Sequence, residues 1–167
     1  MTVPELNNLD KSQLKVELLK CCGATVWIEK MSMIFPVHDS KELFEKAEKI
    51  WFSCNEKDWR EAFKHHPRIG DINSLKEKFS GTAHWAEKEQ SGILETSLTV
   101  LEALAKANSQ YEEKFGYIFI VCATGKSAEE MLNMLESRLK NKQADEIMIA
   151  MGEQNKITKI RLQKLLS

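Results

Sequence analysis

A histidine at the abrupt end of a helical pattern is the first residue that could carry chemistry. The run from Asp58 to Gly70 reads DWREAFKHHPRIG, which places His66 directly before Pro67. Proline disfavours the α conformation in the residue before it, so the sequence predicts an extended His66 whose ring can face a pocket. Histidine can donate or accept a proton near neutral pH. His66 is therefore an acid/base candidate, although a lone histidine is more often structural.

Arg161 is the second candidate, because it lies on the apolar stripe of the last predicted helix. That stripe consists of Ile147, Met151, Gln154, Thr158, Arg161 and Leu165. A guanidinium that faces inward needs a carboxylate or an anionic ligand, since burying it unpaired is very costly. The alternatives are a structural ion pair, or a side chain that carries its charge out to solvent.

Glu89 and Gln90 form the third candidate group, at the end of a short predicted helix. Gly92 follows them, at a place where backbone can approach a ligand closely. The alternative is a solvated helix face within the charged stretch around Lys88.

A metal site is the main chemical alternative, because four histidines could supply nitrogen ligands. They are His38, His65, His66 and His84. Their spacing matches no H-E-x-x-H or comparable motif, and two adjacent histidines point in different directions, so we predict no metal. The sequence also has no phosphate-binding glycine loop, nucleophile elbow or dinucleotide fingerprint.

Composition narrows the class of partner. The 167 residues include 24 Lys and Arg against 25 Asp and Glu, with the charges scattered along the chain. We therefore expect a small-molecule substrate and neither nucleic acid nor membrane as a partner. No membrane-spanning run or signal peptide is evident, so we expect a cytosolic protein. Cysteines 21, 22, 54 and 122 are expected to be reduced and to act as small buried hydrophobes.

The elements that must position these residues are predicted to be helices. Capping residues and three-to-four-residue apolar spacing indicate helical segments. These are residues 10–22, 24–31, a helix from Ser40 that carries Leu43 to Trp51, 55–66, a short helix from Thr82, a long helix from Gly92 to Lys114, 127–140 and 144–165. Residues 70–81 are predicted to form a loop.

Residues 115–125 are the only long apolar run, and glycines lie near both ends. We find no second strand for them to pair with, so we predict a buried extended segment and not a sheet. The expected fold class is all-α, a compact bundle of about eight helices around one core. A single domain over residues 1–167 is the expected organisation.

Short motifs spread over nearly the whole chain together match the pattern of one known family, in the same order. They are Cys21, Cys22 and Gly23; Trp27 to Met31; Leu43 and Phe44; Ile50 and Trp51; Asp58, Trp59 and Glu61 to Phe63; His66 to Gly70; Trp85, Glu89, Gln90 and Gly92; Phe115, Gly116, Phe119, Cys122 and Ala123; and Lys156 to Thr158 with Arg161 and Leu162. The chain resembles the OHCU decarboxylase family, whose substrate is 2-oxo-4-hydroxy-4-carboxy-5-ureidoimidazoline.

The resemblance implies a decarboxylation that yields (S)-allantoin during urate breakdown. It implies no cofactor, an all-helical fold and a homodimer. The departing carboxylate lies next to carbonyl and imine-type groups that can accept an electron pair, so neither pyridoxal nor thiamine is needed. Two other readings stay open: a helical binding or scaffold module without turnover, and a decarboxylase of a related ureido acid.

The resemblance also implies roles for particular residues. His66 corresponds to the catalytic acid/base, Glu89 to the active-site glutamate and Arg161 to the arginine that holds developing negative charge. Gln90 would assist Glu89, and Pro67 would line the pocket. The backbone of Phe119, Ile120, Val121, Cys122 and Ala123 would contribute N–H and C=O groups. Ala86 stands where many relatives carry serine, so a hydroxyl contact to substrate is expected to be missing, which would weaken binding more than catalysis.

Overall fold

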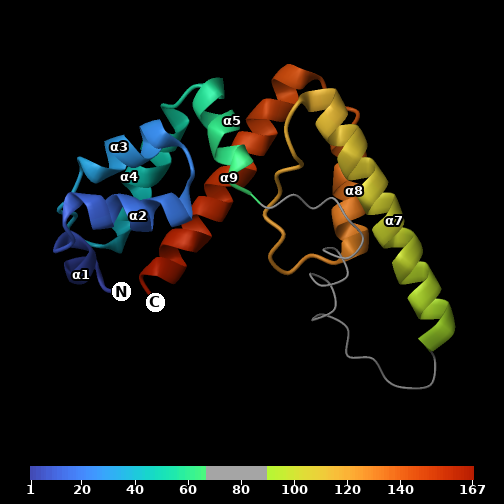
Figure 1. The fold of residues 1–167 in the computed structure, drawn as a ribbon, viewed down its shortest axis with the longest axis horizontal. Coiled ribbons are helices and arrows are strands. Elements are labelled where there is room, and N and C mark those ends of the chain that lie inside the picture. Colours follow the sequence, from blue (N-terminus) through green and yellow to red (C-terminus); the bar gives the residue numbers. More distant parts are fainter. Residues whose placement is uncertain (67–89) are drawn as a thin grey trace. The chain divides into compact units, whose positions relative to one another are not determined.

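The computed structural model describes residues 1–66 and 90–167, with side chains in the second range described from Leu98 onward. These residues form eight helices and no strand (Figure 1). The helices are α1 (Val3–Asn7), α2 (Lys11–Cys21), α3 (Thr25–Ser32), α4 (Ser40–Phe52), α5 (Glu56–Lys64), α7 (Gln90–Phe115), α8 (Ala128–Arg138) and α9 (Gln143–Leu165). None of them is both long and apolar enough to span a membrane.

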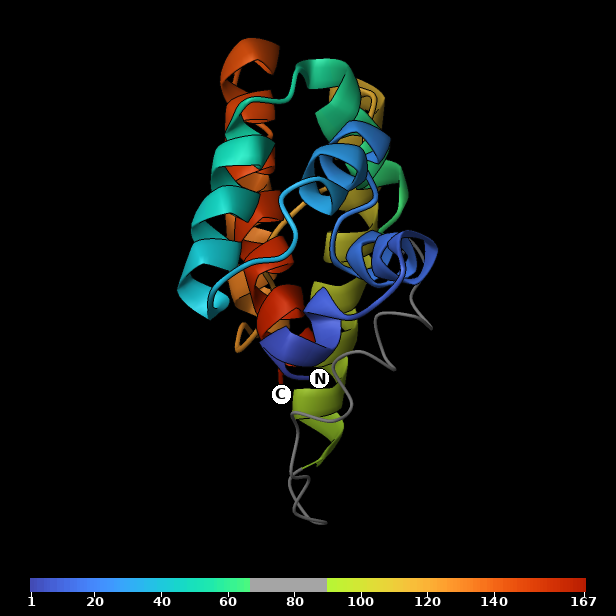
Figure 2. The ribbon, with the colours of Figure 1, turned by 90° about the vertical axis from the view of Figure 1, so that its left-hand side faces the viewer.

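The described chain divides into two compact units. The first contains residues 1–66, 120–122 and 147–167. The described part of the second consists of residues 90–119 and 123–146. Both termini belong to the first unit and lie next to each other (Figure 2), where the Met1 ammonium group donates to the Ser167 carbonyl at 3.4 Å.

Side-chain caps begin most helices of the first unit, as their sequences predict. The Asp10 carboxylate accepts from the N–H groups of the first turn of α2, and Asp39 does the same for α4. Asn55 and Asp58 cap α5 reciprocally. Each cap satisfies N–H groups that have no partner within the helix. Helix α1 was not predicted, although Thr2 and Glu5 form a capping box around Pro4 and could have indicated it.

Two buried tryptophans connect the helices of the first unit. The Trp27 indole N–H, from α3, donates to the Ala47 carbonyl in α4 at 3.0 Å. The Trp51 indole N–H, from α4, donates to the Met151 carbonyl in α9 at 2.9 Å. Both rings are fully buried, so each adds a large apolar surface to the core while its one polar atom is satisfied.

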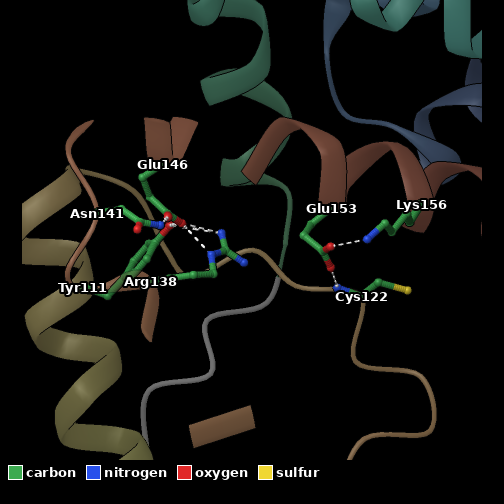
Figure 3. A network of polar contacts seen from close by, with 7 residues as sticks. All are labelled: Tyr111, Cys122, Arg138, Asn141, Glu146, Glu153 and Lys156. Atoms are coloured by element: carbon green, nitrogen blue, oxygen red, sulfur yellow. Dashed lines mark hydrogen bonds and ion pairs between the residues drawn. The ribbon is translucent and has the colours of Figure 1, made fainter. Parts of the chain in front are cut away.

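A buried ion pair lies at the centre of the polar contacts in the second unit (Figure 3). The Arg138 guanidinium at the end of α8 lies 2.5 Å from Glu146, whose side chain is completely buried. The Tyr111 hydroxyl and the Asn141 amide also donate to this carboxylate. Because Arg138 contacts Glu146 through both Nε and Nη2, four donor atoms surround one carboxylate, which compensates for removing its charge from water.

The all-helical class and the buried extended segment are confirmed in the described residues, which contain seven of the eight predicted helices together with α1. Helices α2, α3, α4, α8 and α9 begin within one or two residues of their predicted starts. Helix α5 ends at Lys64, two residues before the predicted stop, because His65 and His66 form the turn that leaves it. The predicted loop at 70–81 and the helix from Thr82 lie outside the described residues, and the single domain stays a prediction.

Removing Glu146 should destabilise the fold strongly. In Glu146→Leu the buried Arg138 loses its ion pair, which costs about 3–5 kcal/mol of unfolding free energy in comparable buried pairs. Chemical denaturation monitored by circular dichroism measures this cost.

Two variants serve as controls for that measurement. Arg138→Met combined with Glu146→Leu should recover most of the loss, because no buried charge is then left unpaired. Glu45→Gln, which removes the exposed partner of Lys41 on α4, should change stability by less than about 0.5 kcal/mol. A loss in Glu146→Leu as small as in Glu45→Gln would contradict a structural role for the pair.

Candidate active site

The connection between α2 and α3 fixes the end of α5. Residue Ala24 at the start of α3 has no side-chain cap of its own, and Glu61 of α5 supplies one. The Glu61 carboxylate accepts from the Thr25 N–H at 3.2 Å and from the Thr25 hydroxyl at 2.5 Å. His65, which directly follows the last residue of α5, packs over Gly23. A Cβ added to Gly23 would lie 2.6 Å from the His65 Cβ. Gly23 therefore allows an approach that no other residue permits.

His66 follows this anchored turn and faces α9. Its Nε2 atom lies 2.5 Å from Gln154 Oε1, and its Nδ1 atom lies 3.5 Å from Arg161 Nη2. Its backbone N–H donates to the Phe63 carbonyl at 3.2 Å, which holds the residue in the last turn. The ring is half-buried. The structure therefore brings His66 and Arg161, two of the three predicted catalytic residues, into one place.

Arg161 lies where the end of α2 presents unpaired carbonyl oxygens. Its Nη1 atom donates to the Cys21 carbonyl at 3.4 Å, and Cys21 is the last residue of α2. The last carbonyls of a helix lack intrahelical partners and carry partial negative charge, which favours a cation there. Among the described residues no carboxylate forms an ion pair with Arg161, so the structural ion pair considered for it is absent from this part of the chain. A half-buried guanidinium in this setting can bind an anion.

The environment of His66 favours its neutral form. Burial lowers the pKa of His66 below its usual value of 6.5, and the nearby Arg161 charge lowers it further, while the hydrogen bond to Gln154 acts in the opposite direction. At neutral pH the ring is then an imidazole with one free lone pair, the form that accepts a proton.

The predicted extended segment follows Gly116 and contains no helix or strand before Ala123. Phe119, Ile120 and Val121 are buried, and Cys122 and Ala123 are half-buried. In the first unit the Cys122 N–H donates to the Glu153 carboxylate at 2.7 Å, and Lys156 forms an ion pair with the same carboxylate (Figure 3). The Ala123 carbonyl accepts from the Lys126 N–H. Part of the backbone predicted to bind substrate is thus engaged within the protein.

Phe119 belongs to the second unit, and two residues of that unit hold its ring. The Arg138 guanidinium lies 4.7 Å from the centre of its ring, and the Tyr111 ring meets it edge-on at 5.2 Å. Both contacts stabilise a buried aromatic ring, and they fix the first residue of the predicted substrate-binding segment.

The remaining predicted site residues lie outside the described part of the chain. Pro67, Ala86 and Glu89 belong to the stretch before α7, and Gln90 is the first residue of α7 without a described side chain. Their predicted roles stay predictions.

The sequence analysis missed two residues that contact this site. Gln154 is completely buried and touches His66, and Glu153 binds the backbone of Cys122. Gln154 was recognised on the buried stripe of the last helix but was given no role. A buried polar side chain on such a stripe needs a partner, and that requirement could have indicated its contact with a site residue.

Cys21, Cys22 and Cys54 are buried, as predicted, whereas Cys122 is only half-buried. Burial raises the pKa of Cys21 to about 11 and that of Cys22 to about 12. Little thiolate is therefore present at neutral pH, which makes these thiols poor nucleophiles. Among the described residues no group of three His, Cys, Asp or Glu side chains could hold a metal ion.

An all-helical protein that places a neutral histidine beside a cation has the elements of a proton-transfer enzyme acting on an anion. Comparison with known proteins is more specific. The OHCU decarboxylase family model matches residues 7–163. The chain belongs to the OHCU decarboxylase family.

Relatives and solved structures agree with this assignment. The Arabidopsis thaliana uric acid degradation bifunctional protein TTL is 38% identical over 148 residues, which are 88% of this chain and 45% of that protein. The Amia calva 2-oxo-4-hydroxy-4-carboxy-5-ureidoimidazoline decarboxylase is 38% identical over 85 residues, 48% of this chain and 46% of that protein. The chain thus spans about half the length of these curated relatives. A crystal structure of OHCU decarboxylase in the presence of (S)-allantoin is 36% identical, with a TM-score of 0.72 over 90% of this chain and 96% of that one.

Filling the space at Gly23 should disturb the turn that carries His66. In Gly23→Ala the new methyl group would overlap the His65 Cβ, so the end of α5 must shift. We expect a loss of about 1–3 kcal/mol in unfolding free energy, as for other overpacked sites. Thermal melting followed by circular dichroism measures it.

Gly152→Ala is the matched control, since a Cβ at this position in α9 meets nothing within 4 Å. Replacing this helical glycine should raise stability by about 0.5–1 kcal/mol. If both alanine variants are equally stable, the close packing of His65 on Gly23 is not a constraint on the fold.

The lowered pKa of His66 should appear in the pH dependence of stability. The folded state binds its proton less readily than the unfolded state, so stability is fully present above the unfolded pKa of about 6.5 and decreases as pH falls through the lower folded pKa. Wild type should therefore lose stability relative to His66→Gln in that acidic window. Denaturation at a series of pH values tests this, and a His66 pKa at or above 6.5 by NMR would contradict it.

Proposed function

We propose that this protein decarboxylates 2-oxo-4-hydroxy-4-carboxy-5-ureidoimidazoline to (S)-allantoin in the breakdown of urate. The observation that carries the proposal is the neutral His66 ring 3.5 Å from Arg161, a cation that no described carboxylate neutralises. Membership of the family and likeness to the structure determined in the presence of (S)-allantoin support the choice of substrate.

The two residues match what the reaction requires. Loss of carbon dioxide leaves an electron pair on the substrate, which its adjacent carbonyl and imine-type groups can accept. The Arg161 guanidinium can hold the carboxylate or the charge that develops on a ring oxygen. His66 can remove the proton of the substrate hydroxyl as the carbon–carbon bond breaks and return a proton to one face of the neighbouring carbon.

The other predicted residues complete the proposed pocket. Glu89 and Gln90 would hydrogen-bond the ureido and ring N–H groups. Pro67 and the backbone of residues 119–123 would form its walls, and Ala86 would leave one hydroxyl contact absent. In residues 119–123 the Cys122 N–H already donates to Glu153, so this amide is not offered to substrate.

Assembly and location belong to the same proposal. The resemblance to the family supports a homodimer, and a cytosolic location is part of the same proposal. The small substrate is the partner that these features favour.

The activity can be tested by forming the unstable substrate from urate with uricase and the hydrolase that follows it, then adding this protein. We expect the circular dichroism of one allantoin enantiomer to appear rapidly. His66→Ala should reduce this rate by about 100-fold or more, the contribution of a general acid or base. Its unfolding free energy should fall by no more than about 1–3 kcal/mol, the cost of leaving the buried Gln154 oxygen without a partner.

The same assay separates the competing readings. If wild-type protein gives only racemic product at the uncatalysed rate, the proposal is overturned. The reading as a helical binding or scaffold module without turnover would then be favoured. If His66→Ala loses activity because it is unfolded at the assay temperature, His66 has a structural role.

A further inference from the structure

A row of hydrogen bonds inside the first unit ends at His66. Gln154 and Thr158 lie one turn apart on α9, and they are 0% and 3% exposed. The Gln154 Nε2 atom lies 3.1 Å from Thr158 Oγ1, and Gln154 Oε1 lies 2.5 Å from His66 Nε2. Because both residues are buried, these bonds do not compete with water.

The direction of each bond follows from the orientation of the Gln154 amide. Its nitrogen donates to the Thr158 hydroxyl oxygen. The Gln154 oxygen is left facing His66, and an amide oxygen can only accept a hydrogen bond.

We propose that Gln154 is a positioning residue that keeps the neutral His66 ring protonated at Nε2, so that Nδ1 is the nitrogen that exchanges a proton with substrate. Thr158 fixes the orientation of the Gln154 amide. Neither residue contacts the reacting atoms in this assignment, since both act through His66.

The position of Arg161 agrees with this assignment. Its Nη2 atom lies 3.5 Å from Nδ1, a long contact that engages the lone pair only weakly. A substrate anion held by Arg161 would therefore place its own proton donor next to Nδ1. Nδ1 gains one proton from the substrate hydroxyl and later returns one to carbon, while the Nε2–H bond to Gln154 persists. Loss of carbon dioxide from a carboxylate consumes one further proton, which the imine-type nitrogen of the substrate takes from solvent. The ring is neutral before and after turnover.

The tautomer can be measured without substrate, which separates this inference from the proposed function on which its catalytic consequence rests. Long-range proton–nitrogen correlation spectra of nitrogen-15-labelled protein distinguish protonated from unprotonated ring nitrogens. His66→Gln identifies the signals of His66. At a pH well above the unperturbed pKa of histidine, we expect Nε2 to be protonated and Nδ1 to be unprotonated. The opposite pattern would overturn the proposal.

Two substitutions at Gln154 should move the pKa of His66 in opposite directions. Gln154→Glu places a carboxylate on the Nε2–H group, which stabilises the imidazolium and raises the pKa. Gln154→Met has a similar volume but no acceptor, so it removes the hydrogen bond and lowers the pKa. A merely structural role for Gln154 would not reverse the sign between the two variants. Equal pKa values in both would overturn the proposal.

Turnover supplies a second readout once the activity is established. The acidic limb of kcat/KM should move to higher pH in Gln154→Glu, together with the pKa measured by NMR. In Gln154→Met kcat should fall by about 10-fold with KM little changed, less than the roughly 100-fold or greater effect of losing a whole acid or base. A rise in KM with unchanged kcat in Gln154→Met would contradict a role of Gln154 through His66.

Asn155→Ala is the matched control. Asn155 neighbours Gln154, but its amide donates to Glu48 of α4 at 2.8 Å and does not reach His66. The variant should leave the His66 tautomer and pKa unchanged. If wild type has the expected tautomer but forms no allantoin, the positioning of His66 stands and the proposed function fails.

Discussion

Helix α9 buries polar side chains, and each of them must find a hydrogen-bond partner. A buried amide or carboxylate without a partner would cost roughly 1–3 kcal/mol or more. The partners come from elements far away in the sequence: His66 for Gln154, the Cys21 carbonyl for Arg161 and the backbone of Cys122 for Glu153. The buried face of α9 therefore collects the end of α5, the end of α2 and the extended segment around one helix.

The candidate site lies where helix ends meet. The last carbonyl groups of α2 attract Arg161, and the turn after α5 presents His66. These ends can come close together because Gly23 has no side chain to separate the α2–α3 connection from His65. The Glu61 carboxylate stabilises the same junction by capping α3. Local helix chemistry and site geometry are thus satisfied by the same contacts.

The extended segment shows how irregular backbone can be buried without a sheet. Its amide at Cys122 donates to a carboxylate, and the Phe119 ring is held by Tyr111 and Arg138. Arg138 in turn depends on Glu146, since a buried guanidinium needs its counter-charge. Polar groups that look expensive in a core therefore fix the backbone that the proposed reaction uses.

Sequence alone determined most helices, since caps such as Asp10 and Asn55 act within a few residues. It also indicated His66 and Arg161 as candidates for the site, because a histidine before proline and an arginine on an apolar stripe stand out locally. Only the tertiary structure decided that Gln154, 88 residues from His66 in the chain, forms a hydrogen bond with its ring. Helical periodicity shows which face of α9 is buried but not what lies opposite, and that depends on how distant helices pack.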